Sequence, residues 1–179
     1  MACDLTAGRA EICKDSVGGL KNIYFTNYDE IDGYTYDVTN TDVIATAFGA
    51  ATINAFKYEL KGANVLDETV TSSRDNGTTF TEQALTVVLK KVDITTHQEM
   101  KLLSYGRPRA IIEDYNGNFR LLGLEHGLEL ETMVISSGTV MADLNGYTLT
   151  LKGMEKIPAN FIDTANEAGL LAVGFTVVS

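Results

Sequence analysis

A long β-hairpin is the sequence feature that most restricts the fold. Residues 65–72 and 78–92 are rich in β-branched and apolar residues and flank the turn Asp75-Asn76-Gly77. Asn and Gly tolerate the positive φ angles that tight hairpin turns require. The polar tip, Arg74 to Gly77, is predicted to project beyond the sheet. It is a candidate for contact with a neighbouring subunit, and a plain solvent loop is the alternative.

Other segments also have the composition of strands. In residues 54–60 the apolar side chains alternate with charged ones, which predicts a half-buried strand with one face in water. Residues 118–131 are predicted to form one continuous strand after the tight turn Asn116-Gly117. The remaining strands are expected at residues 20–28, 109–115, 146–154 and 170–178.

One helix is expected at residues 96–104, with a capping box that begins at Thr95 or Thr96. Met100 and Leu103, three residues apart, are predicted to face the core. Residues 157–165 are expected to form a turn or a short helix. One helix among about eight strands predicts a mainly β fold, an antiparallel sandwich or barrel with one flanking helix. We expect a single domain over residues 1–179, with residues 1–19 as an N-terminal arm.

Length and charge restrict the class of protein. A chain of 179 residues with 45% hydrophobic residues can bury one core. The net charge of −10 disfavours sequence-specific binding to nucleic acid, because an acidic surface repels phosphates. Such a surface serves solubility, or it lies near DNA without adhering. No apolar run approaches the roughly 20 residues that span a membrane, and the N-terminus does not resemble a signal peptide. We therefore expect a protein made in the cytoplasm, with no membrane partner.

The sequence offers little for catalysis. His97 and His126 have no partner at metal-binding spacing, and Cys3 and Cys13 have no second pair to complete a zinc site. The nucleophile-elbow, phosphate-loop and dinucleotide-binding motifs are not found. We therefore expect no catalytic residue, no metal and no cofactor, and the protein is not expected to be an enzyme.

Residues 118–131 contain an acidic pattern. If they form one strand, Glu125, Glu129 and Glu131 share one face, and leucines fill the other. Like charges along one face are tolerated only where water reaches them. The glutamate face is therefore either an ordinary wet sheet face or an acidic wall that faces a water-filled channel.

Parts of the sequence resemble phage tail-tube and related virion proteins. The resemblance lies in residues 115–123 (YNGNFRLLG) and 125–129 (EHGLE), and then in a Ser-Gly turn at 137–138, residues 143–147 and a Pro-Ala step at 158–159. Residues 13–25 also look like the start of structural proteins from phages of Bacteroidetes-type hosts. The motifs cover about half of the chain.

The resemblance implies a β-sandwich or barrel that forms rings, commonly hexameric, stacked into a tube. It implies a long hairpin and a terminal arm that reach the next ring, and a negatively charged lumen for DNA. The candidates are the hairpin tip, residues 1–19 and the glutamate face. Expected partners are further copies of the chain, other virion proteins and DNA as non-specific cargo. The expected location is the virion, assembled in the host cytoplasm.

Two other functions stay open. A capsid decoration or head-to-tail connector protein has a similar β-sandwich and would also be a virion component. A β-barrel module that binds a small molecule or a protein is the alternative from another class.

Overall fold

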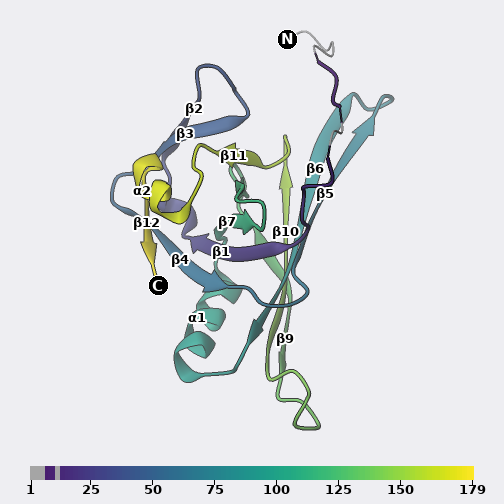
Figure 1. The fold of residues 1–179 in the computed structure, drawn as a ribbon, viewed down its shortest axis with the longest axis vertical. Coiled ribbons are helices and arrows are strands. Elements are labelled where there is room, and N and C mark those ends of the chain that lie inside the picture. Colours follow the sequence, from purple (N-terminus) through teal and green to yellow (C-terminus); the bar gives the residue numbers. More distant parts are fainter. Residues whose placement is uncertain (1–6, 11–12) are drawn as a thin grey trace.

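The computed structural model describes residues 7–10 and 13–179, which form two β-sheets packed against each other (Figure 1). The larger sheet curls into a half-barrel. Its eight strands lie in the order β12 (Phe175–Val178), β4 (Ile53–Glu59), β1 (Leu20–Thr26), β7 (Arg109–Asp114), β8 (Phe119–Leu122), β11 (Asn160–Ile162), β3 (Val43–Phe48) and β2 (Gly33–Tyr36). The smaller sheet has four strands in the order β5 (Val65–Ser73), β6 (Thr78–Lys90), β10 (Gly146–Glu155) and β9 (Glu129–Ser136).

The predicted fold class, a mainly β sandwich or barrel with a flanking helix, is confirmed. The smaller sheet is antiparallel throughout. The larger sheet is mixed, because β11 pairs with β3, and β12 with β4, in the parallel sense. Strands β2 and β3 were not predicted, since their segment mixes polar and apolar residues without clear alternation.

Each face of the larger sheet packs against an apolar core. The first lies between the sheets and includes Ile23 and Phe25, and the second lies inside the curl and includes Tyr24. Each fully buried side chain of this size contributes about 1.5–3 kcal/mol by leaving water. Burial on both faces corrects the prediction for β4. Its Ala55 is buried in the second core, and Lys57 pairs with Glu167 at 2.6 Å. The predicted wet face therefore exists only at Glu59 and Lys61, which are exposed.

The β5–β6 hairpin is confirmed, with Gly77 in its turn at φ +63°. Strand β10 supports β6 only as far as Thr81, which lies opposite Glu155. Beyond this point, β5 and β6 pair only with each other, and almost every residue there is exposed. The tip therefore projects from one end of the smaller sheet, as predicted (Figure 1).

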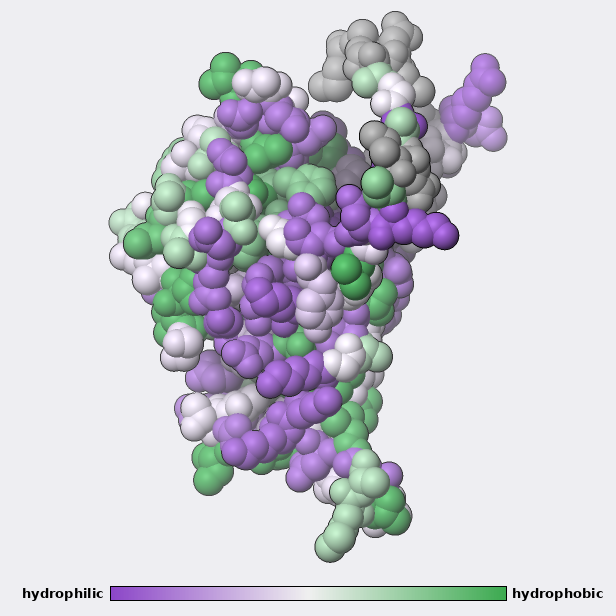
Figure 2. Space-filling model, in the orientation of Figure 1, coloured by the Kyte–Doolittle hydropathy of each residue, from purple (hydrophilic) through white to green (hydrophobic). Residues whose placement is uncertain are grey.

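The β9–β10 turn lies at the opposite end of the same sheet, and its Val140 and Met141 are exposed. In the surface view, hydrophilic residues form a broad band across the middle of this side of the molecule, and hydrophobic residues gather at the lower tip (Figure 2). The smaller sheet thus carries a polar tip at one end and an apolar turn at the other.

Helix α1 (Ile94–Tyr105) follows β6 and packs Met100 into the first core, as predicted, with Leu103 half-buried beside it. The predicted capping box is wrong. Asp93 caps the helix instead, because its carboxylate accepts a hydrogen bond from the Thr96 backbone N–H at 2.9 Å.

The prediction of one strand over residues 118–131 is also wrong. Strand β8 ends at Leu122, a turn occupies residues 123–128, and β9 begins at Glu129. Gly123 and Gly127 have φ angles of +66° and +75°, in the left-handed region that side chains disfavour. The Gly127 backbone N–H donates to the Gly123 carbonyl at 3.0 Å and closes the turn.

The C-terminal quarter differs from prediction at two places. Residues 157–165 contain the short strand β11 in place of a turn or helix. Residues 170–178 begin as helix α2 (Leu170–Val173), directly after the 3₁₀ turn η2 (Glu167–Gly169), and only then form β12. The other 3₁₀ turn within the described residues, η1 (Tyr28–Glu30), follows β1. Helix α2 and β12 both contribute to the second core, and the mostly apolar run shows no periodic pattern that marks the change of structure.

The described part of the N-terminal arm, residues 7–10 and 13–19, has no helix or strand and is exposed. The Asn116 side chain holds Val17 by two hydrogen bonds, at 2.8 Å to its N–H and 2.7 Å to its carbonyl. Cys13 is exposed and free, and Cys3 lies outside the described residues. No helix within the described residues is long and apolar enough to cross a membrane.

Candidate functional site

Two of the three predicted glutamates lie together on the outer face of the smaller sheet, the face that points away from the first core. Glu129 lies opposite Lys152 of β10, and a β-bulge follows, where Leu151 pairs with Leu130 and Thr150 with Thr132. The bulge leaves Glu131 as the extra residue, directed to solvent. Its carboxylate lies 3.0 Å from the Lys152 amine.

Lys152 also lies 3.7 Å from Glu82 of β6, a residue that was not predicted as part of the site. The hydrogen bond and the charge of Glu131 raise the pKa of Lys152, which therefore stays charged. Two carboxylates thus lie within ion-pair distance of one amine, and Glu129 lies opposite Lys152 in the strand pair. We call Glu82, Glu129, Glu131 and Lys152 the acidic cluster, which keeps an excess of negative charge.

Threonines cover much of the remaining outer face. Alternation along β6 and β10 directs Leu85, Val87, Leu149 and Leu151 inward and the intervening residues outward. None of the outward threonines is fully buried, although Thr86, Thr148 and Thr150 belong to the central strands β6 and β10. The outward threonines are Thr69, Thr71, Thr86, Thr132, Thr148 and Thr150. The outer face is therefore open to water and largely polar, although it also carries the exposed apolar residues Val65, Val134 and Met154.

Glu125 does not join the other two glutamates. It lies in the turn at residues 123–128, where its carboxylate accepts a hydrogen bond from the Tyr34 hydroxyl of β2. The Tyr28 hydroxyl donates to the Glu125 carbonyl at 2.5 Å. The premise that the three glutamates share one face of one strand is therefore wrong, although all three are exposed and the neighbouring leucines are buried or half-buried.

Glu155, at the end of β10, stabilises the same turn from the protein interior, and it is only 4% exposed. Its carboxylate accepts hydrogen bonds from the backbone N–H of His126 at 2.8 Å and of Glu125 at 3.2 Å. The His126 ring nitrogen Nδ1 lies 3.3 Å from the same carboxylate. The hydrogen bonds to the buried Glu155 carboxylate therefore fix the backbone of the turn directly before β9.

A second buried carboxylate connects the first strand to the middle of the larger sheet. Glu113 of β7 is 5% exposed and accepts hydrogen bonds from Lys21 at 2.6 Å, Asn22 at 2.5 Å and the Tyr24 hydroxyl at 3.2 Å. Burial raises the pKa of Glu113, but the hydrogen bonds from Lys21 and Asn22 outweigh burial and leave the pKa below its ordinary value of 4.5.

This shift predicts acid sensitivity. Because the pKa of Glu113 is lowered by folding, its contribution to stability is complete above pH ~4.5 and is lost as the pH falls through the folded-state value. We expect the Glu113→Gln variant to be less stable than the original protein at neutral pH, with a difference that shrinks on acidification. Urea unfolding at a series of pH values measures this, and a difference that stays constant with pH contradicts it.

The hairpin tip behaves as an exposed polar turn. Arg74, Asp75, Asn76 and Gly77 are all exposed, and the Asn76 N–H donates to the Ser73 hydroxyl at 3.3 Å. Among the described residues, Arg74 and Asp75 form no ion pair. The tip is therefore available to a neighbouring molecule.

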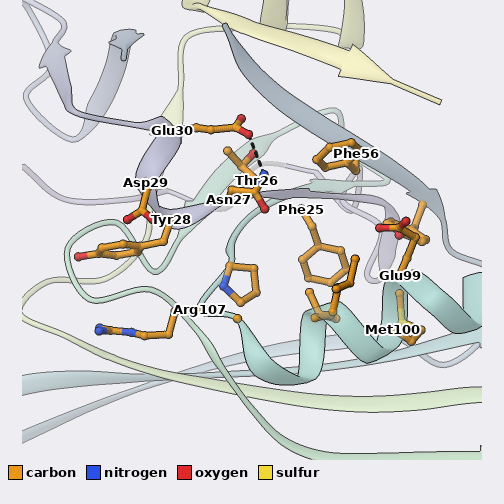
Figure 3. Close-up of a pocket in the computed structure, with 15 residues that line it drawn as sticks. Phe25, Thr26, Asn27, Tyr28, Asp29, Glu30, Phe56, Glu99, Met100 and Arg107 are labelled. Atoms are coloured by element: carbon orange, nitrogen blue, oxygen red, sulfur yellow. Dashed lines mark hydrogen bonds between the residues drawn. The ribbon is translucent and has the colours of Figure 1, made fainter. Parts of the chain in front are cut away.

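A wide cleft lies elsewhere, between α1 and the β1–η1 segment, and has a volume of about 650 Å³. Figure 3 shows Phe25 above the helix, Phe56 and Glu99 towards one side, and Tyr28, Asp29 and Arg107 towards the other. Sequence reasoning did not find this cleft, because its residues come from three separate segments, 25–30, 56–58 and 99–108, and share no motif.

The histidines are placed apart. His97 lies 3.3 Å from the Tyr147 hydroxyl, and His126 belongs to the turn described above. Within residues 7–10 and 13–179, no group of three or more His, Cys, Asp or Glu side chains is arranged to hold a metal ion.

Comparisons with protein-family models, with curated proteins and with solved structures give no match to this chain, so the site is interpreted from its own geometry.

Proposed function

We propose that this chain is a structural subunit that assembles into rings, which stack into a tube of the kind found in phage tails. The observation that carries the proposal is the smaller sheet. Its two edge strands, β5 and β9, are unpaired on their outer sides among the described residues, and its outer face is uncovered. Such edges present free backbone N–H and C=O groups that favour pairing with another chain.

The geometry of the edges supports a head-to-tail contact. The four strands alternate in direction, so β9 of one copy and β5 of the next would pair as antiparallel strands. A contact between two different surfaces repeats from copy to copy and closes a ring when the rotation permits. Strand β5 has nine residues and pairs with β6 without a bulge, which leaves a long regular edge for this contact.

In the proposed ring, the uncovered face points inward and the larger sheet lies on the outside. The acidic cluster and the threonines then line the bore. DNA carries a phosphate charge about every 1.7 Å of its axis, so a negative wall prevents adhesion. Charges in water at physiological salt are screened over ~8 Å, so the repulsion acts only at close range and does not block passage.

The projecting hairpin supports stacking. The β5–β6 tip and the β9–β10 turn lie at opposite ends of the smaller sheet, so each is placed to meet a different neighbouring ring (Figure 1). An exposed hairpin that buries little within its own subunit gains its contacts on assembly.

The lumen assignment predicts the effect of charge reversal. Replacing Glu129 and Glu131 by lysine is expected to leave folding intact, because both side chains are exposed and a surface ion pair contributes only about 0–1 kcal/mol. Assembled particles should then retain DNA, in a filter-binding assay, where the original protein does not.

A matched control reverses the exposed Asp32 and Asp163, neither of which is on the smaller sheet. The control should not retain DNA. Equal retention by both double variants would show that overall charge, and not the bore, determines DNA binding.

Imaging separates the other virion functions. Rings or tubes of the purified protein support the proposal, whereas binding to capsids as monomers or trimers would assign the chain to decoration or connector proteins.

A further inference from the structure

The cleft beside α1 has an apolar floor that is reachable from solvent. Phe25, Tyr58 and Met100 are part of the first core or pack against it, and they also line the cleft. Phe56 and Leu102 line it as well, and they are 37% and 61% exposed. An apolar surface of this kind, rimmed by polar residues, is typical of a binding groove.

The rim of the cleft is acidic. Asp29 and Glu99 form no ion pair among the described residues, and Glu30 is hydrogen-bonded to Asn27 at 2.7 Å and to the Asn54 N–H at 2.6 Å. Burial, and then the negative charge of Glu99, raises the pKa of the Tyr58 hydroxyl. The field of the Glu99 carboxylate therefore reaches the floor of the cleft.

The basic residue on the rim is already engaged. Arg107 lies with its guanidinium 5.0 Å from the centre of the Tyr28 ring and donates a hydrogen bond to the His126 carbonyl. A second guanidinium, that of Arg109, lies 4.4 Å from the centre of the same Tyr28 ring and donates to the Tyr28 and Ile31 carbonyls. The three carboxylates that line the cleft outnumber these two cations, so the cleft keeps a negative excess that a further cation would offset.

We propose that this cleft binds an extended segment of another protein that carries a large apolar side chain next to a lysine or arginine. The apolar side chain packs on Phe56 and Leu102, and the cation lies beside Glu99. The proposal is independent of ring assembly, since the cleft lies on α1 and the larger sheet and not on the edges of the smaller one.

Two capped peptides, Lys-Phe-Lys-Phe-Lys and Glu-Phe-Glu-Phe-Glu, are suitable probes. We expect the lysine peptide to shift the NMR methyl signals of Met100, Leu102 and Leu103, and the glutamate peptide to leave them unchanged. Glu99→Lys, on the exposed surface of α1, should weaken binding of the lysine peptide about tenfold or more. Circular dichroism confirms that the variant is folded.

The matched control is Asp163→Lys, which makes the same charge change at an exposed residue outside the cleft. It should keep most of the affinity. The proposal is wrong if both lysine variants weaken binding equally, since overall charge then explains it, or if the two peptides bind alike. It is also wrong if, in a variant that no longer assembles through the edges of the smaller sheet, the same methyl signals shift with protein concentration alone, because the occupant is then a second copy.

Discussion

Proline introduced into the middle of β5 should prevent ring formation without unfolding the subunit. Successive residues of a strand direct their N–H groups to opposite sides, so one of Thr69 and Val70 donates towards β6 and the other towards the free edge. Proline has no backbone N–H, and edge strands tolerate it at positions where the N–H would face outward. The edge-facing variant should therefore fold normally and lose assembly completely.

The proline variants at Thr69 and Val70 serve as controls for each other, because only one of them removes an N–H from the free edge. The variant whose N–H faces β6 leaves a carbonyl without its partner and should lose about 1–3 kcal/mol of unfolding free energy. Thermal unfolding identifies which variant is which, and sedimentation velocity then reports assembly. If the stable variant assembles as well as the original protein, β5 is not the contact edge.

Replacing Glu155 by alanine should destabilise the subunit by about 2–4 kcal/mol. The carboxylate is buried and accepts hydrogen bonds from the backbone N–H groups of Glu125 and His126, which would lose their acceptor. The turn at residues 123–128 should open first, because it depends on these bonds. Chemical denaturation measures the loss, and hydrogen exchange at Glu125 and His126 locates it.

Glu155→Gln is the control for shape. Glutamine keeps an acceptor oxygen in the same place but has no charge, so it should recover part of the stability that alanine loses. A loss below about 0.5 kcal/mol for Glu155→Ala would contradict the role assigned to this carboxylate.

The strands that were predicted correctly have local signals. The β5–β6 hairpin has an Asp-Asn-Gly turn between β-rich segments, and β10 alternates Tyr147, Leu149 and Leu151 towards the core. These patterns depend only on neighbours along the chain, so the sequence reveals them.

The errors occur where distant contacts decide the structure. Residues 118–131 alternate like a strand, but Gly123 and Gly127 allow a turn that Glu155 then fixes from 30 residues away. Residues 170–178 are mostly apolar, both where α2 and β12 enter the second core and where Leu171 is exposed. Such a run lacks the periodic pattern that distinguishes a helix from a strand.

The acidic site was found in part for the same reason. Glu129 and Glu131 stand out along the chain, whereas Lys152 and Glu82 reach them only through strand pairing. The alternation of residues 81–89 could have placed Glu82 on the outer face, but its neighbours follow from the register. The cleft beside α1 had no signal in the sequence.

Negative-stain electron microscopy of the purified protein, over a range of concentrations and salt, tests the central claim most directly. The account predicts rings with a central bore, single or stacked, that are lost in the edge-facing β5 proline variant. A particle that remains a monomer under all these conditions would contradict it.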